Sequence, residues 1–202
     1  MLFQHQQPVH DEILRTVKTF FEADWQELPV RPRFNRFITG PTGTGKTTLV
    51  RSVAAKLNLP VFELSASNWI PIGTSERGAR STWLDIAHFC LMHNEGIIFL
   101  DEVDKLGEHS AWMNHLRVEI FALLDQKVPQ HLRIKPVDGD DEPEEEYEWA
   151  LKRQKVEERL RTRMILIGAG AFQSLWQTRS QASCGFNPKP VVNGRSLALH
   201  EM

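Results

Sequence analysis

The sequence predicts an α/β fold in which helices cover both faces of a mostly parallel β-sheet. β-prone runs alternate with helical patterns along the first hundred residues, the arrangement typical of βαβ units. Residues 96–100 are almost wholly apolar, as in a central parallel strand that is covered on both faces. The length of 202 residues with 41% hydrophobic residues fits one globular domain, or one domain with an appendage.

The first elements in chain order form a helix and then a βαβ unit. Apolar side chains recur at helical spacing over 11–22, and prolines at 29 and 32 end that helix. A β-prone run over 34–39 stops at Gly40, and a glycine-rich turn follows it. The amphipathic segment 47–57 predicts the next helix, and 60–64 predicts the second strand.

The second half adds further helices and two strands. From Trp83 the apolar residues fall at i, i+3, i+4, i+7 and i+8, which predicts a helix over 77–92 with one buried face. The strand 96–100 and a helix over 116–124 come next. The acidic block 138–148 and the charged helix 149–163 are interpreted as a solvated insertion, because blocks of like charge usually lie in water. The segment 164–167 predicts a strand leading into Gly-Ala-Gly.

These elements predict three regions. Residues 1–33 form an N-terminal helix and linker, and residues 34–178 form the α/β core, which carries the charged insertion at about 138–163. Residues 179–202 are expected to be a loop-rich C-terminal segment, because Ser, Asn, Pro and Gly are frequent there.

Composition excludes several classes of protein. With 24 Lys and Arg against 26 Asp and Glu, the net charge of −2 gives no overall basic field for nucleic acid, although a local basic face stays open. Two cysteines far apart exclude a disulfide scaffold and a cysteine zinc site, and the eight histidines form no H-x-x-x-H pair. The N-terminus does not read as a signal peptide, and no apolar run approaches the ~20 residues that cross a bilayer. We therefore expect a cytoplasmic protein with no membrane partner.

Residues 40–47 carry the strongest motif. The run Gly-Pro-Thr-Gly-Thr-Gly-Lys-Thr fits G-x-x-x-x-G-K-[ST], whose glycines let the backbone curl with its amides turned inward around phosphates. The helix that follows adds the positive end of its dipole. A chance glycine-rich turn with a surface lysine is the alternative, but the strand before and the helix after are the context that the motif requires. The predicted ATP-binding residues are Gly40, Pro41, Thr42, Gly43, Thr44, Gly45, Lys46, Thr47 and Thr48.

Four side chains are assigned chemical roles in this site. Lys46 is expected to contact the β- and γ-phosphates, and the Thr47 hydroxyl to bind Mg²⁺. The apolar strand 96–100 delivers Asp101 and Glu102 at its carboxyl end, the edge where open parallel sheets bind ligands. Asp101 would hold Mg²⁺ through water, and Glu102 would orient and deprotonate the attacking water. The alternative is an ordinary helix start, which acidic residues also favour.

These motifs resemble those of the AAA+ ATPases. The run Asp-Glu-Val-Asp-Lys at 101–105 resembles the DE-x-DK run of the ClpX/HslU unfoldase branch, as 165–173 resembles the strand of that branch that ends in Gly-Ala-Phe. Cys184-Gly-Phe186 is similar to the following Gly-Phe segment, and 6–21 is similar to the N-terminal helix that starts at the adenine. The resemblance implies a three-layer α/β/α P-loop NTPase fold, hydrolysis of MgATP, assembly into a ring, and Val9 beside the base.

Two positions depart from the pattern of that family. The tip of the strand after 164, where family members carry a polar sensor, is matched here by Ala169. In the segment that aligns with the pore loop, Pro71 stands where the family has an aromatic residue, and Trp69 is the nearest aromatic. Trp69 is either packed at the base of the loop or a displaced pore aromatic.

A third departure concerns length. The family continues with an arginine finger and a helical lid, and no lid domain is expected within these residues. None of the arginines that could approach a neighbouring subunit sits in a recognisable finger motif, and for each a solvated side chain is the alternative. These candidates are Arg77, Arg80, Arg179 and Arg195.

Phosphoryl transfer is therefore the predicted chemistry, with ATP and Mg²⁺ as cofactors. The favoured function is an ATPase core that self-associates and remodels a macromolecular client, with protein favoured over DNA. Two alternatives stay open: an ATP-dependent regulator or loader in a DNA transaction, and a nucleotide switch that does not hydrolyse ATP.

Overall fold

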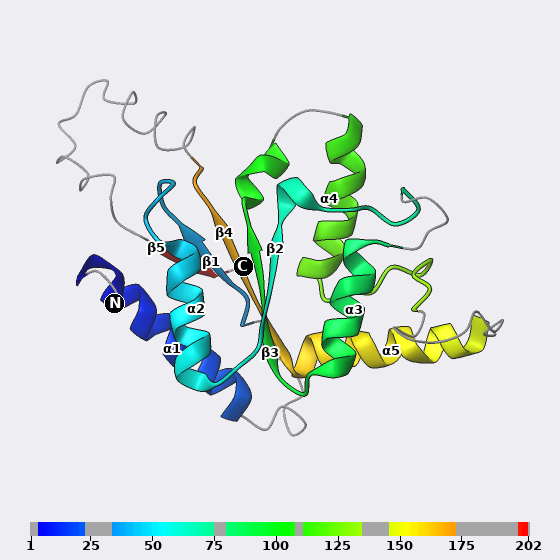
Figure 1. Cartoon of the computed structure of the whole chain (residues 1–202), viewed down its shortest axis with the longest axis horizontal. Helices are drawn as coiled ribbons and strands as arrows, with labels where there is room; N and C mark the ends of the chain where they lie inside the picture. Colours follow the sequence, from blue (N-terminus) through cyan, green and yellow to red (C-terminus); the bar gives the residue numbers. More distant parts are fainter. Residues whose placement is uncertain are drawn as a thin grey trace.

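A five-stranded sheet organises the molecule (Figure 1). In this computed structural model, residues 4–22, 34–74, 80–107, 111–134, 146–172 and 198–201 are described. The spatial order is β2-β3-β4-β1-β5, with parallel pairing between β2 and β3, β3 and β4, and β4 and β1. The predicted mostly parallel sheet is therefore confirmed. The strands are β1 (Arg36–Thr39), β2 (Val61–Ser65), β3 (Gly96–Asp101), β4 (Met164–Gly170) and β5 (Ala198–Glu201).

Helices lie on both faces of this sheet, which makes the three layers that the sequence predicts (Figure 1). α1 and α2 cover one face, while α3, α4 and α5 pack on the other. The α-helices of the described residues are α1 (Gln7–Glu22), α2 (Lys46–Leu57), α3 (Thr82–Met92), α4 (Ala111–Leu124) and α5 (Glu146–Thr162). Short 3₁₀ turns are η1 (Gln4–Gln6), η2 (Ala66–Asn68) and η4 (Val103–Gly107).

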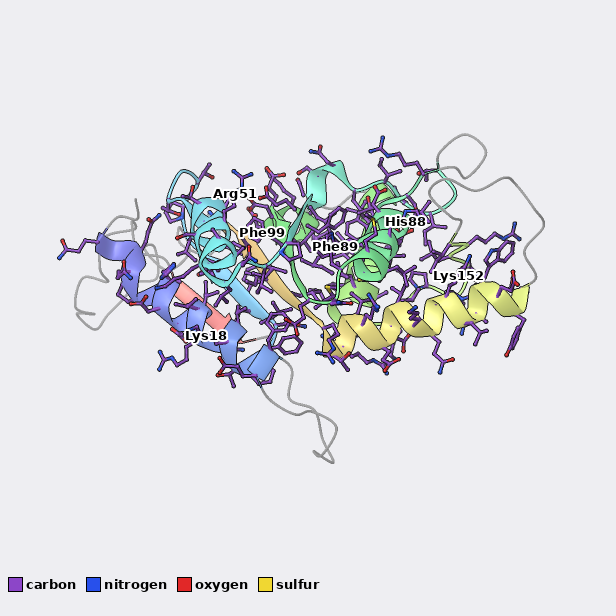
Figure 2. The ribbon with its side chains drawn as sticks, turned by 60° about the horizontal axis from the view of Figure 1, so that its bottom comes forward. Lys18, Arg51, His88, Phe89, Phe99 and Lys152 are labelled. Carbon is purple, nitrogen blue, oxygen red and sulfur yellow. The ribbon has the colours of Figure 1, made fainter. Side chains whose placement is uncertain are left out.

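Burial on both faces explains why the first five residues of β3 carry no polar side chain. Successive side chains of a strand point to opposite faces, so Ile97 and Phe99 enter the core beneath α1 and α2. Ile98 and Leu100 enter the second core, beneath α3, α4 and α5. Phe89 of α3 and Phe99 of β3 lie among the side chains packed between helices and sheet in Figure 2. Two apolar cores thus fix the strand whose carboxyl end carries Asp101.

α5 differs from the predicted solvated insertion. The helix is mostly charged, yet Val156 and Leu160 are fully buried in the core shared with α3 and β4. These residues are four apart, so they share one face of the helix. Arg159 Nη1 on this helix donates to the carbonyls of Cys90, at 2.8 Å, and His93, at 3.1 Å, and so caps the end of α3. α5 is therefore a structural part of the domain, although most of its side chains are charged.

The ends of the chain show two further differences. α1 begins at Gln7 rather than at Asp11, because Pro8 is tolerated in the first turn of a helix. Residues 198–201, expected in a loop-rich segment, form β5 and pair antiparallel with β1. Residues 138–145 of the predicted acidic block 138–148 and the Cys184–Phe186 segment lie outside the described residues. Among the helices that are described, none is long and apolar enough to span a membrane.

Candidate nucleotide site

The loop between β1 and α2 owes its curvature to two glycines. Gly43 and Gly45 adopt φ values of 80° and 79°, in the left-handed region that side chains with a Cβ rarely occupy. The Pro41 carbonyl accepts hydrogen bonds from the Thr44 N–H, at 3.4 Å, and from Thr44 Oγ1, at 2.8 Å. Gly45 caps α2 without a side-chain acceptor, so the first amides of the helix face the loop. Thr42 and Thr48 lie at the surface on either side.

Lys46 is buried inside this loop. Its ammonium donates to the Gly40 carbonyl at 2.8 Å and to the Pro41 carbonyl at 3.1 Å, and 8% of the residue is exposed. Burial lowers the pKa of Lys46, while the carboxylates of Asp101 and Asp104 oppose the change. The lysine thus presents a positive charge between the loop and the end of β3.

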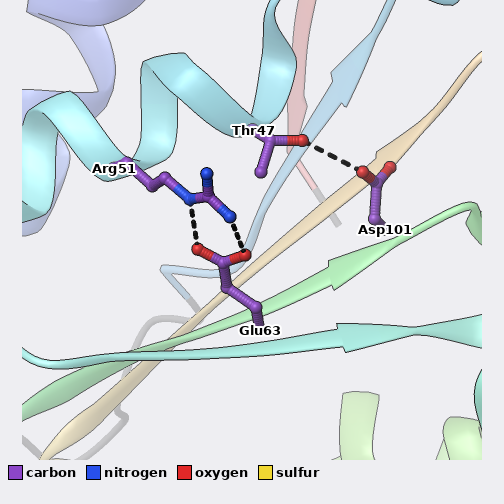
Figure 3. A network of polar contacts seen from close by, with 4 residues as sticks. All are labelled: Thr47, Arg51, Glu63 and Asp101. Atoms are coloured by element: carbon purple, nitrogen blue, oxygen red, sulfur yellow. Dashed lines mark hydrogen bonds and ion pairs between the residues drawn. The ribbon is translucent and has the colours of Figure 1, made fainter.

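The two predicted motifs meet at a single contact. Thr47 Oγ1, at the start of α2, donates to Asp101 Oδ2 at 3.1 Å, across 54 residues of sequence (Figure 3). The other oxygen of Asp101 accepts the Glu102 N–H at 2.8 Å. A hydroxyl beside a carboxylate fits Mg²⁺, which takes few protein ligands and keeps several waters. No cluster of three or more His, Cys, Asp or Glu side chains suited to a metal occurs among the described residues.

Glu102 is held in a strained backbone and a defined side-chain position. Its φ of 59° is uncommon for a residue with a Cβ. Ser65 Oγ, at the end of β2, donates to Glu102 Oε2 at 2.7 Å. Hydrogen bonds from Ser65 and Ser67 lower the pKa of Glu102 because they stabilise its ionised form. The sequence pattern identified Glu102 but gave no signal for its serine partners.

Replacing Ser65 by alanine is expected to raise the pKa of Glu102 toward the ordinary glutamate value. If the ionised carboxylate is the active base, the wild type keeps its activity to a lower pH than the variant. The acidic limb of the kcat profile should therefore move to higher pH in Ser65→Ala. Hydrolysis measured across pH tests this, with Ser52→Ala on α2 as the control. An acidic limb at the same pH in all three proteins would contradict the prediction.

A cleft opens beside the Thr47–Asp101 contact. It has a volume of about 490 Å³ and lies between β2, the end of β3 and the start of α3. Glu63 lines it and forms a bidentate ion pair with Arg51 of α2, with Nη2 to Oε2 at 2.6 Å (Figure 3). Arg80, one of the candidate finger residues, lines the same cleft in its own chain. Arg77, Arg179 and Arg195 fall outside the described residues.

The N-terminal segment reaches the loop through a residue that the sequence did not single out. Val9, predicted beside the base, packs with α1 and α2 in the core and is 8% exposed. Gln6, one turn earlier, is 1% exposed and donates from Nε2 to the Thr44 carbonyl at 2.7 Å. No motif marks a single glutamine, so only the fold could reveal this contact.

Trp69 is packed at the base of its loop, the first of the two alternatives for this residue. It is 4% exposed, and its indole N–H donates to the Glu119 carboxylate at 2.9 Å. The other oxygen of that carboxylate accepts the Ile72 N–H at 2.8 Å. Glu119 of α4 therefore fixes the loop that carries Trp69, and the aromatic side chain is not presented to a polypeptide.

Glu119→Ala is expected to lower the free energy of unfolding by about 2–4 kcal/mol, because two part-buried donors lose their acceptor. Urea denaturation measures this loss. Glu119→Gln keeps one oxygen acceptor and should lose about half as much. Equal stability of Glu119→Ala and the wild type would show that the carboxylate does not hold the loop.

Ala169 lies in β4 and is fully buried in the core beneath α1 and α2. It pairs in register with Ile38 of β1 and presents no polar group to the loop. The next residue, Gly170, lies near Asp104, since a Cβ there would be 3.0 Å from Asp104 Oδ1. The described end of β4 therefore contributes no polar side chain, while the carboxylates of Asp101 and Asp104 come from β3 and the turn after it.

Comparisons with known proteins agree with this geometry. Residues 37–129 match the family described as "ATPase family associated with various cellular activities (AAA)". The ATP-dependent zinc metalloprotease FtsH of Thermotoga maritima is 38% identical over 72 residues, which cover 36% of this chain and 12% of that protein. The ATP-dependent zinc metalloprotease FtsH 1 of Conexibacter woesei is 33% identical over 100 residues, covering 48% of this chain and 15% of that protein. The corresponding FtsH of Acidobacterium capsulatum is 34% identical over 100 residues, with 49% and 15% covered.

The similarity to these relatives covers only a small part of their length. The matched residues cover 12% to 15% of the length of these three curated relatives. All three are FtsH proteins, so they support an AAA+ ATPase domain without pointing to the ClpX/HslU branch.

Proposed function

We propose that this chain, which carries an AAA ATPase domain over residues 37–129, binds ATP with Mg²⁺ and hydrolyses it to ADP and phosphate. The observation that carries the proposal is the contact between Thr47 and Asp101, which joins the glycine-rich loop to the carboxyl end of β3. The loop provides donors for a polyphosphate, and β3 provides carboxylates for a metal and a water.

Each side chain has a role in this proposal. The amides of the loop and the Lys46 ammonium bind the phosphates. Thr47 and Asp101 hold Mg²⁺, which supplies neutralisation of the charge that develops on the phosphates. Glu102 orients the attacking water and accepts its proton, with its carboxylate positioned by Ser65. Catalysis is then mainly positioning and electrostatic stabilisation.

We further propose that hydrolysis drives the remodelling of a protein client by a ring of subunits. The AAA match and the relatives named as ATP-dependent proteases support a protein client over DNA. The DE-x-DK resemblance of 101–105 keeps the ClpX/HslU branch as a hypothesis, and a cytoplasmic location also stays a prediction. Buried Trp69 argues against that residue as the grip on a polypeptide.

The test is phosphate release from ATP over a range of protein concentrations, with Mg²⁺ and with the metal chelated. An arginine supplied by a neighbouring subunit raises such rates about 10³–10⁵-fold. We therefore expect slow turnover at low concentration, a steep rise as subunits assemble, and no turnover without Mg²⁺. A fast rate independent of concentration would refute the need for assembly.

The same assay separates the alternatives. Stimulation by an unfolded protein supports the remodeller, whereas stimulation by DNA alone would favour a DNA-directed ATPase. Tight ATP binding without phosphate release at any concentration would instead indicate a nucleotide switch.

A further inference from the structure

Gln6, the last residue of η1 directly before α1, connects the N-terminal segment to the glycine-rich loop. Its side chain is 1% exposed, and its amide Nε2 donates to the Thr44 carbonyl at 2.7 Å, 38 residues away in the sequence. The neighbouring Gln7 behaves differently, since it is exposed and donates to Asp11 Oδ1 one turn along the same helix. Gln6 is therefore a buried polar side chain committed to the backbone of the loop.

The contact fixes the orientation of one peptide unit. In a planar trans peptide the C=O and the next N–H point in opposite directions. A Thr44 carbonyl held on the Gln6 side therefore turns the Gly45 N–H to the other side of that peptide. Three other loop carbonyls are engaged as well, since Gly40 and Pro41 accept from Lys46, and Gly45 accepts the Leu49 N–H at 2.9 Å.

In contrast to these carbonyls, several N–H groups of the loop have no hydrogen-bond partner among the described residues. Within the described part of the chain, the N–H groups of Gly43, Gly45, Lys46 and Thr47 donate to no carbonyl or side chain. Four loop carbonyls that have partners, together with these four N–H groups, favour the binding of an anion in the concave side of the loop.

The peptide between Thr44 and Gly45 needs a contact from outside the loop to hold its orientation. Glycine adopts φ values of either sign readily, so the Thr44–Gly45 peptide can rotate at little steric cost. A rotated peptide would present the negative end of its dipole in place of an N–H donor. The Gln6 side chain packs so closely that a Cβ added at Gly45 would collide with its amide nitrogen. Hydrogen bond and packing together hold the peptide in one orientation.

We propose that Gln6 is a positioning residue for polyphosphate binding: its amide holds the Thr44 carbonyl and thereby aims the Gly45 N–H at the phosphates. The inference rests on the proposed function, because it assigns Gln6 to the same ATP site. It also assigns the N-terminal segment a part in phosphate binding that is separate from any contact with the base.

The test compares two ligands and three proteins. Gln6→Met keeps a side chain of similar length without a donor, and Gln7→Ala is the matched control. Calorimetry measures the affinities for MgATP and for inorganic tripolyphosphate with Mg²⁺, a probe that has no base. We expect Gln6→Met to weaken both affinities by about three- to ten-fold, the usual worth of one hydrogen bond, and Gln7→Ala to change neither. In steady state, KM for ATP should rise in Gln6→Met while kcat stays within about two-fold of wild type.

The outcomes distinguish the inference from the function on which it rests. Wild-type binding with no loss in Gln6→Met would overturn the positioning role, and so would a loss for ATP without a loss for tripolyphosphate, because Gln6 would then recognise the base or ribose. A wild type that binds neither ligand overturns the proposed function itself, and the role of Gln6 with it. If thermal melting shows that Gln6→Met is unfolded, Gln6→Ala takes its place, with the same parallel loss expected.

Discussion

Lys46→Ala is expected to weaken ATP binding by about 100-fold or more and to abolish hydrolysis. The wild-type ammonium is buried within the loop, where two of its three donors bind the Gly40 and Pro41 carbonyls and the third is available to a phosphate oxygen. A charge-assisted hydrogen bond of this kind is worth about 1.5–3 kcal/mol, and the ammonium also attracts the other phosphate oxygens by its charge. Alanine removes that charge and leaves the rest of the loop sequence intact. Calorimetric titration with MgATP measures the loss of affinity, and phosphate release measures the loss of activity.

Lys56→Ala is the matched control, because Lys56 is exposed in the last turn of the same helix. It should bind ATP like the wild type. Circular dichroism should show that both variants are folded. If Lys46→Ala bound ATP with wild-type affinity, the loop would not be the phosphate site, and the proposed function would be wrong.

Glu102→Gln should retain ATP without cleaving it. The amide oxygen of glutamine can still accept the hydrogen bond from Ser65, so the side chain keeps its place while its capacity to take a proton is lost. Loss of a general base lowers kcat by about 10²–10⁴-fold. The affinity for ATP should stay within about two-fold of the wild type. Single-turnover hydrolysis and calorimetry on the same preparation separate the two effects.

Glu95→Gln makes the same chemical change at the opposite end of β3, where Glu95 pairs with Arg163 rather than facing the loop. Its hydrolysis rate should equal that of the wild type. Normal hydrolysis by Glu102→Gln would mean that another group activates the water, and the role assigned to this residue would have to be withdrawn.

Local chemistry made the nucleotide motifs predictable. The loop depends on glycine conformation and on one lysine and one threonine, which are contiguous in the sequence. The apolar run of β3 likewise indicates that this strand is buried on both faces. For that reason the three-layer fold could be predicted from the sequence, as could the meeting of Thr47 with Asp101.

Contacts made by residues outside these motifs could not be predicted in the same way. Gln6 and Ser65 are common polar residues, and their significance arises only when the fold brings them to Thr44 and Glu102. α5 was misjudged because two buried side chains are few among many charged ones, and the burial depends on α3 and β4. β5 is a short strand whose pairing depends entirely on its neighbour.

The position of β1 inside the sheet has a consequence for the dynamics of the loop that follows it. Arg36–Thr39 pair along their whole length with β4 on one side and with β5 on the other. Amide protons between two ladders exchange with solvent only when the sheet opens, so exchange from β1 should be among the slowest in the molecule. The turn carrying Gly43 has few such bonds and should exchange quickly. The turn that carries Gly43 can thus open to solvent while the strand before it stays fixed.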